Sequence, residues 1–227
     1  MPATSYRFER PNQDQLEIRR VTTVANPTAA IVAEDARHVG RVMHAAYSRD
    51  LASWGGKPRP IELNRHFGNR GLNRQNAVRM AASISVGSTY WLAFNHLEGV
   101  SQPLQAIGVA KATPSQPRWR KWGDPNCYIN DLEVSMSDAS LGSALLFAAI
   151  GDYEPKREVV TDTFKSAPEA KVRFYHLGFE AKPLSHPHPT IIGDRNLEMF
   201  RMGGVKVGDL RATLIEQNPW LVSPEVC

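Results

Sequence analysis

The stretch that decides the fold runs from Tyr128 to Tyr153 and reads YINDLEVSMSDASLGSALLFAAIGDY. Its first part, Tyr128–Val134, alternates in hydrophobicity and is rich in residues that favour β-structure, so it predicts a strand. A polar loop follows, and apolar residues then recur at helical spacing up to Ile150, with Gly151 at the position of a helix C-terminal glycine. A strand, a loop of small residues and a helix together point backbone N–H groups at an anion. The stretch therefore predicts an anion-binding site.

Composition and charge allow a globular protein with an anionic ligand. Of the 227 residues, 42% are hydrophobic and 22% are charged, which is typical of a chain that buries a sizeable core. Residues 1–80 carry 13 Lys and Arg against 7 Asp and Glu, while the whole chain has a net charge of +4. This surplus suits a phosphate-bearing ligand, a nucleic acid or an acidic partner, or it is simply a solvated basic face.

Other features limit the class of protein. The two cysteines, Cys127 and Cys227, lie far apart and form neither a disulfide framework nor a metal-binding spacing, which fits a reducing cytosol. The first residues lack the apolar segment of a secretory signal, and the apolar run 141–150 is too short to span a bilayer. We therefore expect a soluble, cytoplasmic protein with no membrane partner and no metal.

The order of elements predicts the fold class. Strands are expected at Ile18–Ala25 or Ala29–Ala33, Thr89–His96, Pro103–Thr113, Tyr128–Val134, Glu158–Phe164, Phe179–Pro183 and Asn196–Met202. Helices are expected at Glu34–Tyr47, Asn73–Ser85, Leu141–Ile150, Pro168–Leu177 and Asp209–Gln217. This order predicts one α/β domain, a mixed sheet with helices on both faces. The domain is expected over residues 18–217, after a polar, mobile or loosely attached lead-in (1–17) and before a C-terminal tail (218–227).

The central stretch and the segments after it resemble the GNAT superfamily of acetyl-CoA-dependent N-acetyltransferases. The matching segments, in this order, are YINDLEV, LGSALLFAAI, EVVTDTF and FYHLGFE. The resemblance implies a single GNAT-like domain in which the strand Tyr128–Val134 splays from its neighbour and receives an acyl-thioester. It also implies that the loop and helix start hold the pyrophosphate of acetyl-CoA. The cofactor-binding residues that it implies are Val134, Ser135, Ser140, Leu141, Gly142, Ser143 and Ala144.

Two positions depart from the family pattern. The family loop usually reads Arg or Gln, two residues, Gly, one residue, then Gly or Ala, but here Ser137 and Ser140 stand at the Arg/Gln and first Gly positions. Ser140 adds a Cβ near the phosphate path, yet it is a good N-cap and its hydroxyl could donate to a phosphate. Phe174 stands where many members have a proton-donating Tyr, and Tyr175 faces about 100° away on a helix. Three alternatives follow: Tyr175 protonates the leaving thiolate through a register shift, water protonates it, or catalysis is absent.

The remaining chemistry needs a polarised carbonyl, a neutral amine and a route for protons. The resemblance implies that a backbone N–H near Val134 polarises the carbonyl. Asp131 and Glu133 lie two apart on one strand, so both point to the same face and could accept a proton directly or through water, unless they are merely solvated or paired with Arg. Glu133 is the first choice because it is nearer the reacting carbonyl. We expect acetyl transfer to a primary amine of a small molecule or protein, with the acceptor and oligomeric state open and a homodimer among the alternatives.

Two alternative functions stay open. The altered loop and Phe174 allow a degenerate, non-catalytic CoA-binding or interaction module of the same fold. A nucleic-acid partner, which we rank lower, would use the basic N-terminal part and a loop of aromatic and basic residues. The position of this loop favours packing of its aromatic residues over the sheet edge instead. These loop residues are Arg118, Trp119, Arg120, Lys121 and Trp122. The histidines His44, His186 and His188 do not form a set of metal ligands. The arginines Arg65, Arg70, Arg74 and Arg79 could line the acceptor side of the site, bind the adenosine phosphate or lie on a solvated helix face.

Overall fold

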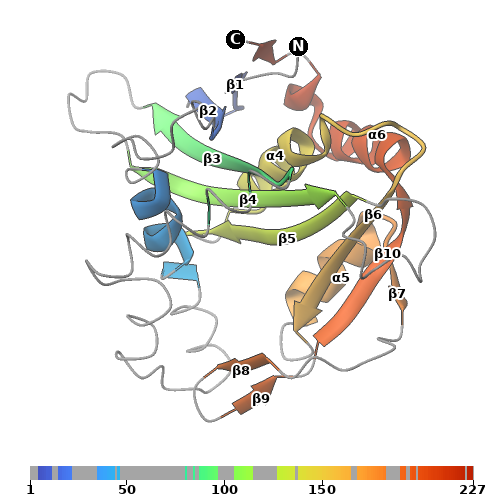
Figure 1. Ribbon diagram of the computed structural model, residues 1–227. Helices are drawn as coiled ribbons and strands as arrows, with labels where there is room; N and C mark the ends of the chain where they lie inside the picture. The colour runs from blue at the N-terminus through green and yellow to red at the C-terminus, as the bar shows by residue number, and fades with distance from the viewer. Residues whose placement is uncertain are drawn as a thin grey trace.

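The computed structural model describes residues 5–11, 15–21, 35–43, 45–46, 80, 84, 87–96, 105–114, 127–135, 138–164, 168–182, 190–192, 195–197, 199–222 and 224–226. Within them, one open sheet of nine strands organises the chain, in the order β11-β1-β2-β3-β4-β5-β6-β10-β7 (Figure 1). The neighbouring strands are antiparallel except β5 and β6, which are parallel. The strands of this sheet are β1 (Ser5–Glu9), β2 (Gln15–Arg20), β3 (Thr89–His96), β4 (Ala106–Pro114), β5 (Cys127–Val134), β6 (Glu158–Phe164), β7 (Glu180–Lys182), β10 (Met199–Lys206) and β11 (Glu225–Val226). A separate antiparallel pair is formed by β8 (Thr190–Ile192) and β9 (Arg195–Leu197).

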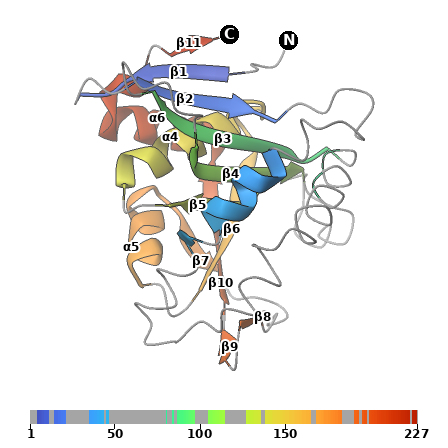
Figure 2. The same ribbon diagram turned by 90° about the vertical axis from the view of Figure 1, so that its left-hand side faces the viewer.

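Helices cover both faces of the sheet, which confirms the expected α/β class (Figure 2). On one face lies the helix of residues 35–43 and 45–46, and residues 80 and 84 are also helical. On the other face lie α4 (Ala139–Ile150), α5 (Pro168–His176) and α6 (Val207–Gln217), followed by a 3-10 turn, η3 (Pro219–Leu221). No helix among these described segments is long and apolar enough to cross a membrane.

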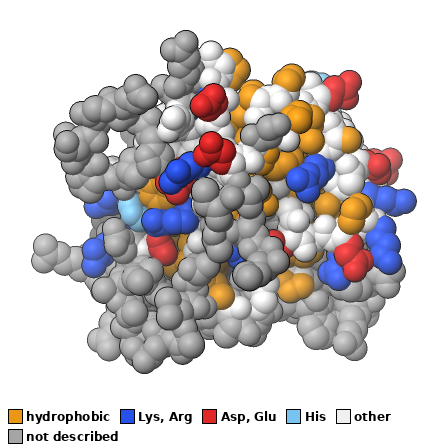
Figure 3. All heavy atoms as spheres, turned by 90° about the horizontal axis from the view of Figure 1, so that it is seen from above, with side chains coloured by type: hydrophobic (Ala, Val, Ile, Leu, Met, Phe, Trp, Pro, Cys, Tyr) orange, Lys and Arg blue, Asp and Glu red, His pale blue; other side chains and the backbone are white. Residues whose placement is uncertain are grey.

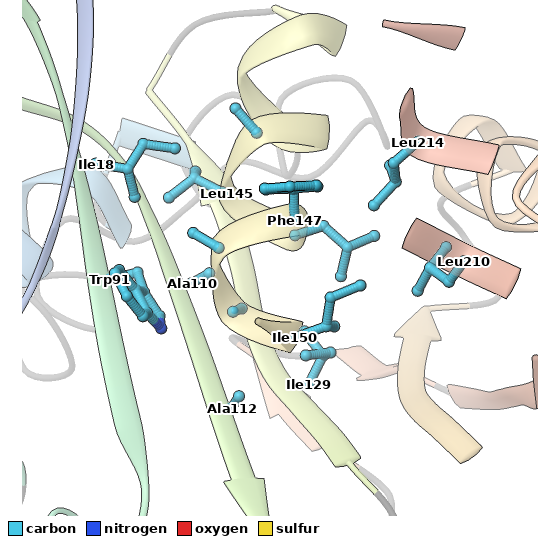
Figure 4. Close-up of a cluster of buried hydrophobic side chains, with 14 of the residues drawn as sticks. Ile18, Trp91, Ala110, Ala112, Ile129, Leu145, Phe147, Ile150, Leu210 and Leu214 are labelled. Carbon is cyan, nitrogen blue, oxygen red and sulfur yellow. The ribbon is translucent and has the colours of Figure 1, made fainter. Parts of the chain in front are cut away.

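Helix α4 is the centre of the larger core. Every residue from Leu141 to Ile150 is buried, so the apolar positions expected along one side extend around the whole helix. Figure 4 shows the reason: α4 lies between the sheet, which contributes Trp91 and Ala110, and α6, which contributes Leu210. A helix covered on all sides can be apolar on all sides. Burying each large side chain there contributes about 1.5–3 kcal/mol.

Both ends of the chain contribute strands to the sheet, including parts of the segments expected as a polar lead-in (1–17) and a C-terminal tail (218–227). Strands β1 and β2 form an antiparallel pair, and the short strand β11 pairs with β1 at Tyr6 and Arg7. Tyr6 and Phe8 of β1 are buried, whereas the alternating residues Arg7 and Glu9 are exposed. Such a short strand contains few apolar residues, which is why it reads as a polar segment. Leu221, within the expected tail, is also fully buried.

The expected strand and helix boundaries are close to the observed ones elsewhere. Strands β3 and β6 have the expected limits, while the strand expected at Pro103–Thr113 runs from Ala106 to Pro114. The strand expected at Asn196–Met202 is divided into β9 and β10. The strand expected at Ile18–Ala25 overlaps β2, which runs from Gln15 to Arg20. The alternative at Ala29–Ala33 lies outside the described residues, as does most of Asn73–Ser85.

Two glycines end helices for different physical reasons. Gly178 follows α5 with a φ of 87°, the left-handed conformation that favours glycine. Gly151 caps α4 as expected, but its φ of −61° is right-handed. A Cβ at Gly151 would lie 2.8 Å from the Tyr6 hydroxyl oxygen. Gly151 is therefore required for space rather than for backbone conformation.

Candidate functional site

The two parallel strands at the centre of the sheet separate from each other. Strands β5 and β6 pair over three residue pairs, from Cys127↔Val159 to Ile129↔Thr161. The register of β5 on β4 then shifts at Asn130, and a bulge of this kind bends the strand that carries the extra residue. The buried Thr161 hydroxyl donates to the Ile129 carbonyl oxygen at 3.0 Å where the pairing ends. Beyond this point the two strands diverge and leave a split (Figure 1).

The backbone of Val134 points toward this split. Ser135 N–H donates to the Ile107 carbonyl oxygen on β4 at 2.8 Å, which makes Ser135 and Ile107 a hydrogen-bonded pair. Hydrogen-bonded and non-hydrogen-bonded pairs alternate along an antiparallel ladder. The neighbouring pair, Val134↔Gly108, is therefore non-hydrogen-bonded. The N–H and C=O of Val134 consequently point away from β4, to the edge of β5 that faces β6.

Glu133 lies on the face of the sheet opposite α4. Its partner across the ladder is Val109, which belongs to the smaller core cluster with residues of the 35–46 helix. Leu132 and Val134, on either side of it in the strand, pack instead against the cluster that contains α4. Glu133 is half-buried. For Asp131 only the backbone is described, and it occupies the next hydrogen-bonded position of the same ladder.

An aspartate, not Ser140, caps the N-terminus of α4. One carboxylate oxygen of Asp138 accepts from Ser140 N–H at 2.9 Å, Leu141 N–H at 3.1 Å and the Ser140 hydroxyl at 2.7 Å. Burial alone would raise the pKa of Asp138, but these hydrogen bonds and the charge of Arg10 outweigh it and lower the pKa. The helix start that was expected to bind phosphate with its amides thus already binds a carboxylate of the same chain.

Two arginines lie at this helix start, and one of them binds the carboxylate directly. Arg10 donates from Nη1 to Asp138 Oδ2 at 2.8 Å and from Nη2 to Asn95 Oδ1 at 2.9 Å. Arg173 on α5 donates from Nη2 to the Ser143 hydroxyl at 3.0 Å and to the Ala139 carbonyl oxygen. Burial lowers the pKa of Arg173, and the nearby Asp138 opposes that effect. No local sequence pattern signals this cluster, because its members come from separate parts of the chain.

The other expected cofactor-binding residues lie at the start of α4 or just before it. Ser135 donates both its N–H and its hydroxyl to the Ile107 carbonyl oxygen, so these donors are used within the fold. The Ser143 hydroxyl donates to the Ala139 carbonyl oxygen at 3.2 Å. Leu141 and Ala144 are fully buried in the core, so only their backbones are placed to meet a ligand.

The two candidate positions on α5 face different surroundings. Phe174 packs against the larger core and makes an edge-to-face contact with Phe179 at a ring-centroid distance of 5.2 Å. Tyr175 is 44% exposed, and Lys171 lies over its ring at 5.7 Å. The hydroxyl that the family pattern places one residue earlier is therefore replaced by a phenyl ring that completes the core.

The paired end of β5 has a different character. Cys127 is fully buried, and burial is the main cause that raises the pKa of its thiol; a hydrogen bond with Tyr153 acts in the opposite direction. Burial also raises the pKa of Tyr153. Both groups are therefore neutral at physiological pH. This end of the strand is structural, in contrast to the end that carries Glu133.

The remaining sequence candidates lie outside the described residues. They are Ser137, His44, His186, His188, Arg65, Arg70, Arg74, Arg79, Arg118, Trp119, Arg120, Lys121 and Trp122. Across the described segments, no three His, Cys, Asp or Glu side chains gather as a metal site. Seen from above, acidic and basic side chains of the described residues lie side by side, so this face has no field of a single sign among them (Figure 3).

The open sheet separates between its two parallel strands, and the buried helix α4 follows the first of them in the chain. This arrangement is the fold of the GNAT superfamily of acetyltransferases. A ribosomal-protein-alanine N-acetyltransferase from Brucella melitensis has a TM-score of 0.54 at 15% identity over 83% of this chain and 98% of its own. A phosphinothricin acetyltransferase (Pat) of the GNAT superfamily from Sinorhizobium meliloti, solved in complex with acetyl-CoA, has a TM-score of 0.52 at 16% identity over 83% and 88%. A ribosomal-protein-S5-alanine acetyltransferase from Vibrio fischeri has a TM-score of 0.54 at 11% identity over 84% and 93%. No family model matches the sequence, and no curated protein sequence does.

Proposed function

We propose that the protein transfers an acetyl group from acetyl-CoA to a primary amine. The observation that carries the proposal is the split between β5 and β6, into which the backbone of Val134 points. An N–H group at a split of this kind can polarise a thioester carbonyl without any side chain. The shared fold with acetyltransferases, one of them in complex with acetyl-CoA, supports acetyl-CoA as the co-substrate, and the isolated cysteines favour the cytoplasm as its location.

In the proposed reaction, the thioester lies along β5 with its carbonyl oxygen on Val134 N–H. The amine approaches from the sheet face that carries Glu133, which takes a proton from the ammonium group directly or through water, with Asp131 as the second candidate base. The neutral nitrogen attacks the carbonyl carbon, the new N–C bond forms and the C–S bond breaks, and the nitrogen releases its second proton to water. The thiolate leaves and accepts a proton from Tyr175 or from water, since Phe174 cannot donate one.

Release of free thiol from acetyl-CoA in the presence of a panel of primary amines tests this proposal. Glu133→Gln keeps the shape of the side chain but removes the base, so we expect kcat/KM to fall by about 10²–10⁴-fold. Glu216→Gln is the control, because Glu216 is an exposed carboxylate on α6, and it is expected to behave as the wild type. Equal thiol release by Glu133→Gln and the wild type would remove Glu133 from the mechanism.

A non-catalytic CoA-binding module is the alternative, favoured by one observation. The α5 position of the family's proton donor is held by Phe174, which packs against the core. In that case isothermal titration detects acetyl-CoA binding while no amine of the panel releases thiol. Turnover that depends on Glu133 would exclude this alternative, and the absence of both binding and turnover would exclude both functions.

A further inference from the structure

Arg173, Asp138 and Arg10 form a charged cluster, here called the Arg173 cluster, where β1, α4 and α5 meet. Arg10 follows β1 and binds one carboxylate oxygen of Asp138. The side chain of Arg10 is 7% exposed, and that of Asp138 is 23% exposed. Arg173 reaches from α5 to Ala139 and Ser143 in the first turns of α4. Among the described side chains, the cluster has two cations and one anion, so its formal charge is positive.

The attraction for an anion here comes from a side chain rather than from the helix amides. The N–H groups of Ser140 and Leu141 already donate to Asp138, so an arriving phosphate would meet a carboxylate at that position. Arg173 is placed differently, because its guanidinium lies against the backbone of Gly142. A Cβ at Gly142 would be 3.4 Å from Nη2 and 3.6 Å from Cζ and Nη1 of Arg173. The glycine lets the planar group rest on the helix, close to the expected cofactor residues.

We propose that Arg173 binds the diphosphate of acetyl-CoA in place of the Arg or Gln that the loop lacks at Ser137, and that the carboxylate of Asp138, one residue before the Ala139 carbonyl that Arg173 binds, repels the diphosphate. This inference rests on the proposed function. A guanidinium is suited to the role because it binds phosphate oxygens with two parallel hydrogen bonds and stays charged. Because like charges repel, removal of the Asp138 charge is expected to strengthen diphosphate binding.

A different explanation is that Arg173 only braces α5 against α4. A brace affects the stability of the fold, but it does not distinguish ligands that differ by a diphosphate. The ligand series is therefore acetyl-CoA, acetyl-dephospho-CoA, which keeps the diphosphate but lacks the 3′-phosphate, and S-acetyl-pantetheine, which has neither. Isothermal titration with each ligand at about 0.15 M salt measures the affinities for the wild type and three variants, with circular dichroism to check the fold.

The variants are Arg173→Met, Asp138→Asn and, as the control, Lys156→Met. Lys156 follows the opposite end of α4, about 18 Å along a helix of this length, and its side chain is 84% exposed. We expect Arg173→Met to weaken both diphosphate ligands by about tenfold to a hundredfold and to leave S-acetyl-pantetheine unchanged. Asp138→Asn is expected to tighten the diphosphate ligands several-fold, and Lys156→Met to change none of the affinities.

The outcomes separate the inference from the proposed function. If the wild type binds acetyl-CoA and Arg173→Met binds it equally well, or loses affinity for all three ligands alike, Arg173 does not hold the diphosphate. A loss restricted to acetyl-CoA would assign Arg173 to the 3′-phosphate and overturn the inference in the same way. If the folded wild type binds none of the three ligands, the proposed function fails, and the inference that rests on it fails too.

Discussion

Asp138 is the residue for which the structure makes the sharpest stability prediction. Its carboxylate caps α4 through Ser140 and Leu141 and pairs with the buried Arg10. Loss of a side-chain N-cap costs about 1 kcal/mol, and loss of one partner of a buried ion pair costs about 3–5 kcal/mol. The second figure is an upper limit here, because Arg10 keeps its hydrogen bond to Asn95. We therefore expect Asp138→Ala to lower the free energy of unfolding by about 2–4 kcal/mol.

Asp138→Asn separates the two contributions. The amide oxygen of Asn can still accept the cap hydrogen bonds, so only the charge is lost, and the expected cost falls to about 1–2 kcal/mol. Urea unfolding at pH 7 measures both variants, with unchanged slopes as the check that only stability has changed. Asp209→Asn is the control, since Asp209 is an exposed acid in the first turn of α6, and it is expected to change the free energy by less than about 0.5 kcal/mol. A cost below that limit for Asp138→Ala would refute the reasoning.

The pH dependence of the same variant gives a second readout. The pKa of Asp138 is lowered in the folded state from an ordinary value of 3.8. A carboxyl group with a lowered folded pKa contributes stability above its unfolded pKa and loses that contribution as the pH falls through the folded pKa. The difference between the wild type and Asp138→Asn should therefore be complete at pH 7 and shrink below about pH 4. A difference that stays constant down to pH 3 would contradict the charge-based explanation.

Three further predictions concern the core and α5. Gly108→Ala places a Cβ 2.6 Å from Leu145 Cδ1, so it should lower the free energy of unfolding, measured in urea, by about 1–3 kcal/mol. Leu145→Ala alone should lower it by about 3–5 kcal/mol, and the double variant should lose less than the sum because the clash is gone. Strict additivity would show that the two groups do not clash. In a Cys227→Ser background, Cys127 should resist a thiol reagent at pH 8 until urea is added, because it is fully buried and its pKa is raised; rapid labelling of the native protein would contradict this. Tyr175→Phe should lower kcat about tenfold or more if its hydroxyl protonates the thiolate, whereas an unchanged kcat assigns that proton to water.

Local patterns predicted the central part of the fold but not its edges. Strands such as β3 and β6 are rich in β-branched and aromatic residues, and α4 is strongly apolar. By contrast, β1 and β2 expose every second residue, and β11 pairs with β1 across the whole length of the chain, so neither their burial nor their pairing can be derived from nearby residues. Ser140 is a good N-cap by residue type, but Asp138 takes the position because the helix begins at Ala139.

The candidate site shows the same division. The interpretation of Tyr128–Val134 as a strand that splays from its neighbour agrees with the pairing of β5 and β6. The direction of the Val134 backbone depends on the register with β4 and on the shift at Asn130, neither of which is visible in the sequence. Arg10 and Arg173 are 128 and 34 residues away from the groups they bind, Asp138 and Ala139 respectively. Only the tertiary fold brings these charges together.

The most direct measurement of the central proposal is a crystal structure of the protein with acetyl-CoA. We predict that the pantetheine arm lies in the split between β5 and β6, with the thioester oxygen within hydrogen-bond distance of Val134 N–H, about 2.7–3.2 Å, and the diphosphate against the start of α4. Acetyl-CoA bound elsewhere on the surface, or a split that stays empty at saturating ligand, would contradict the account.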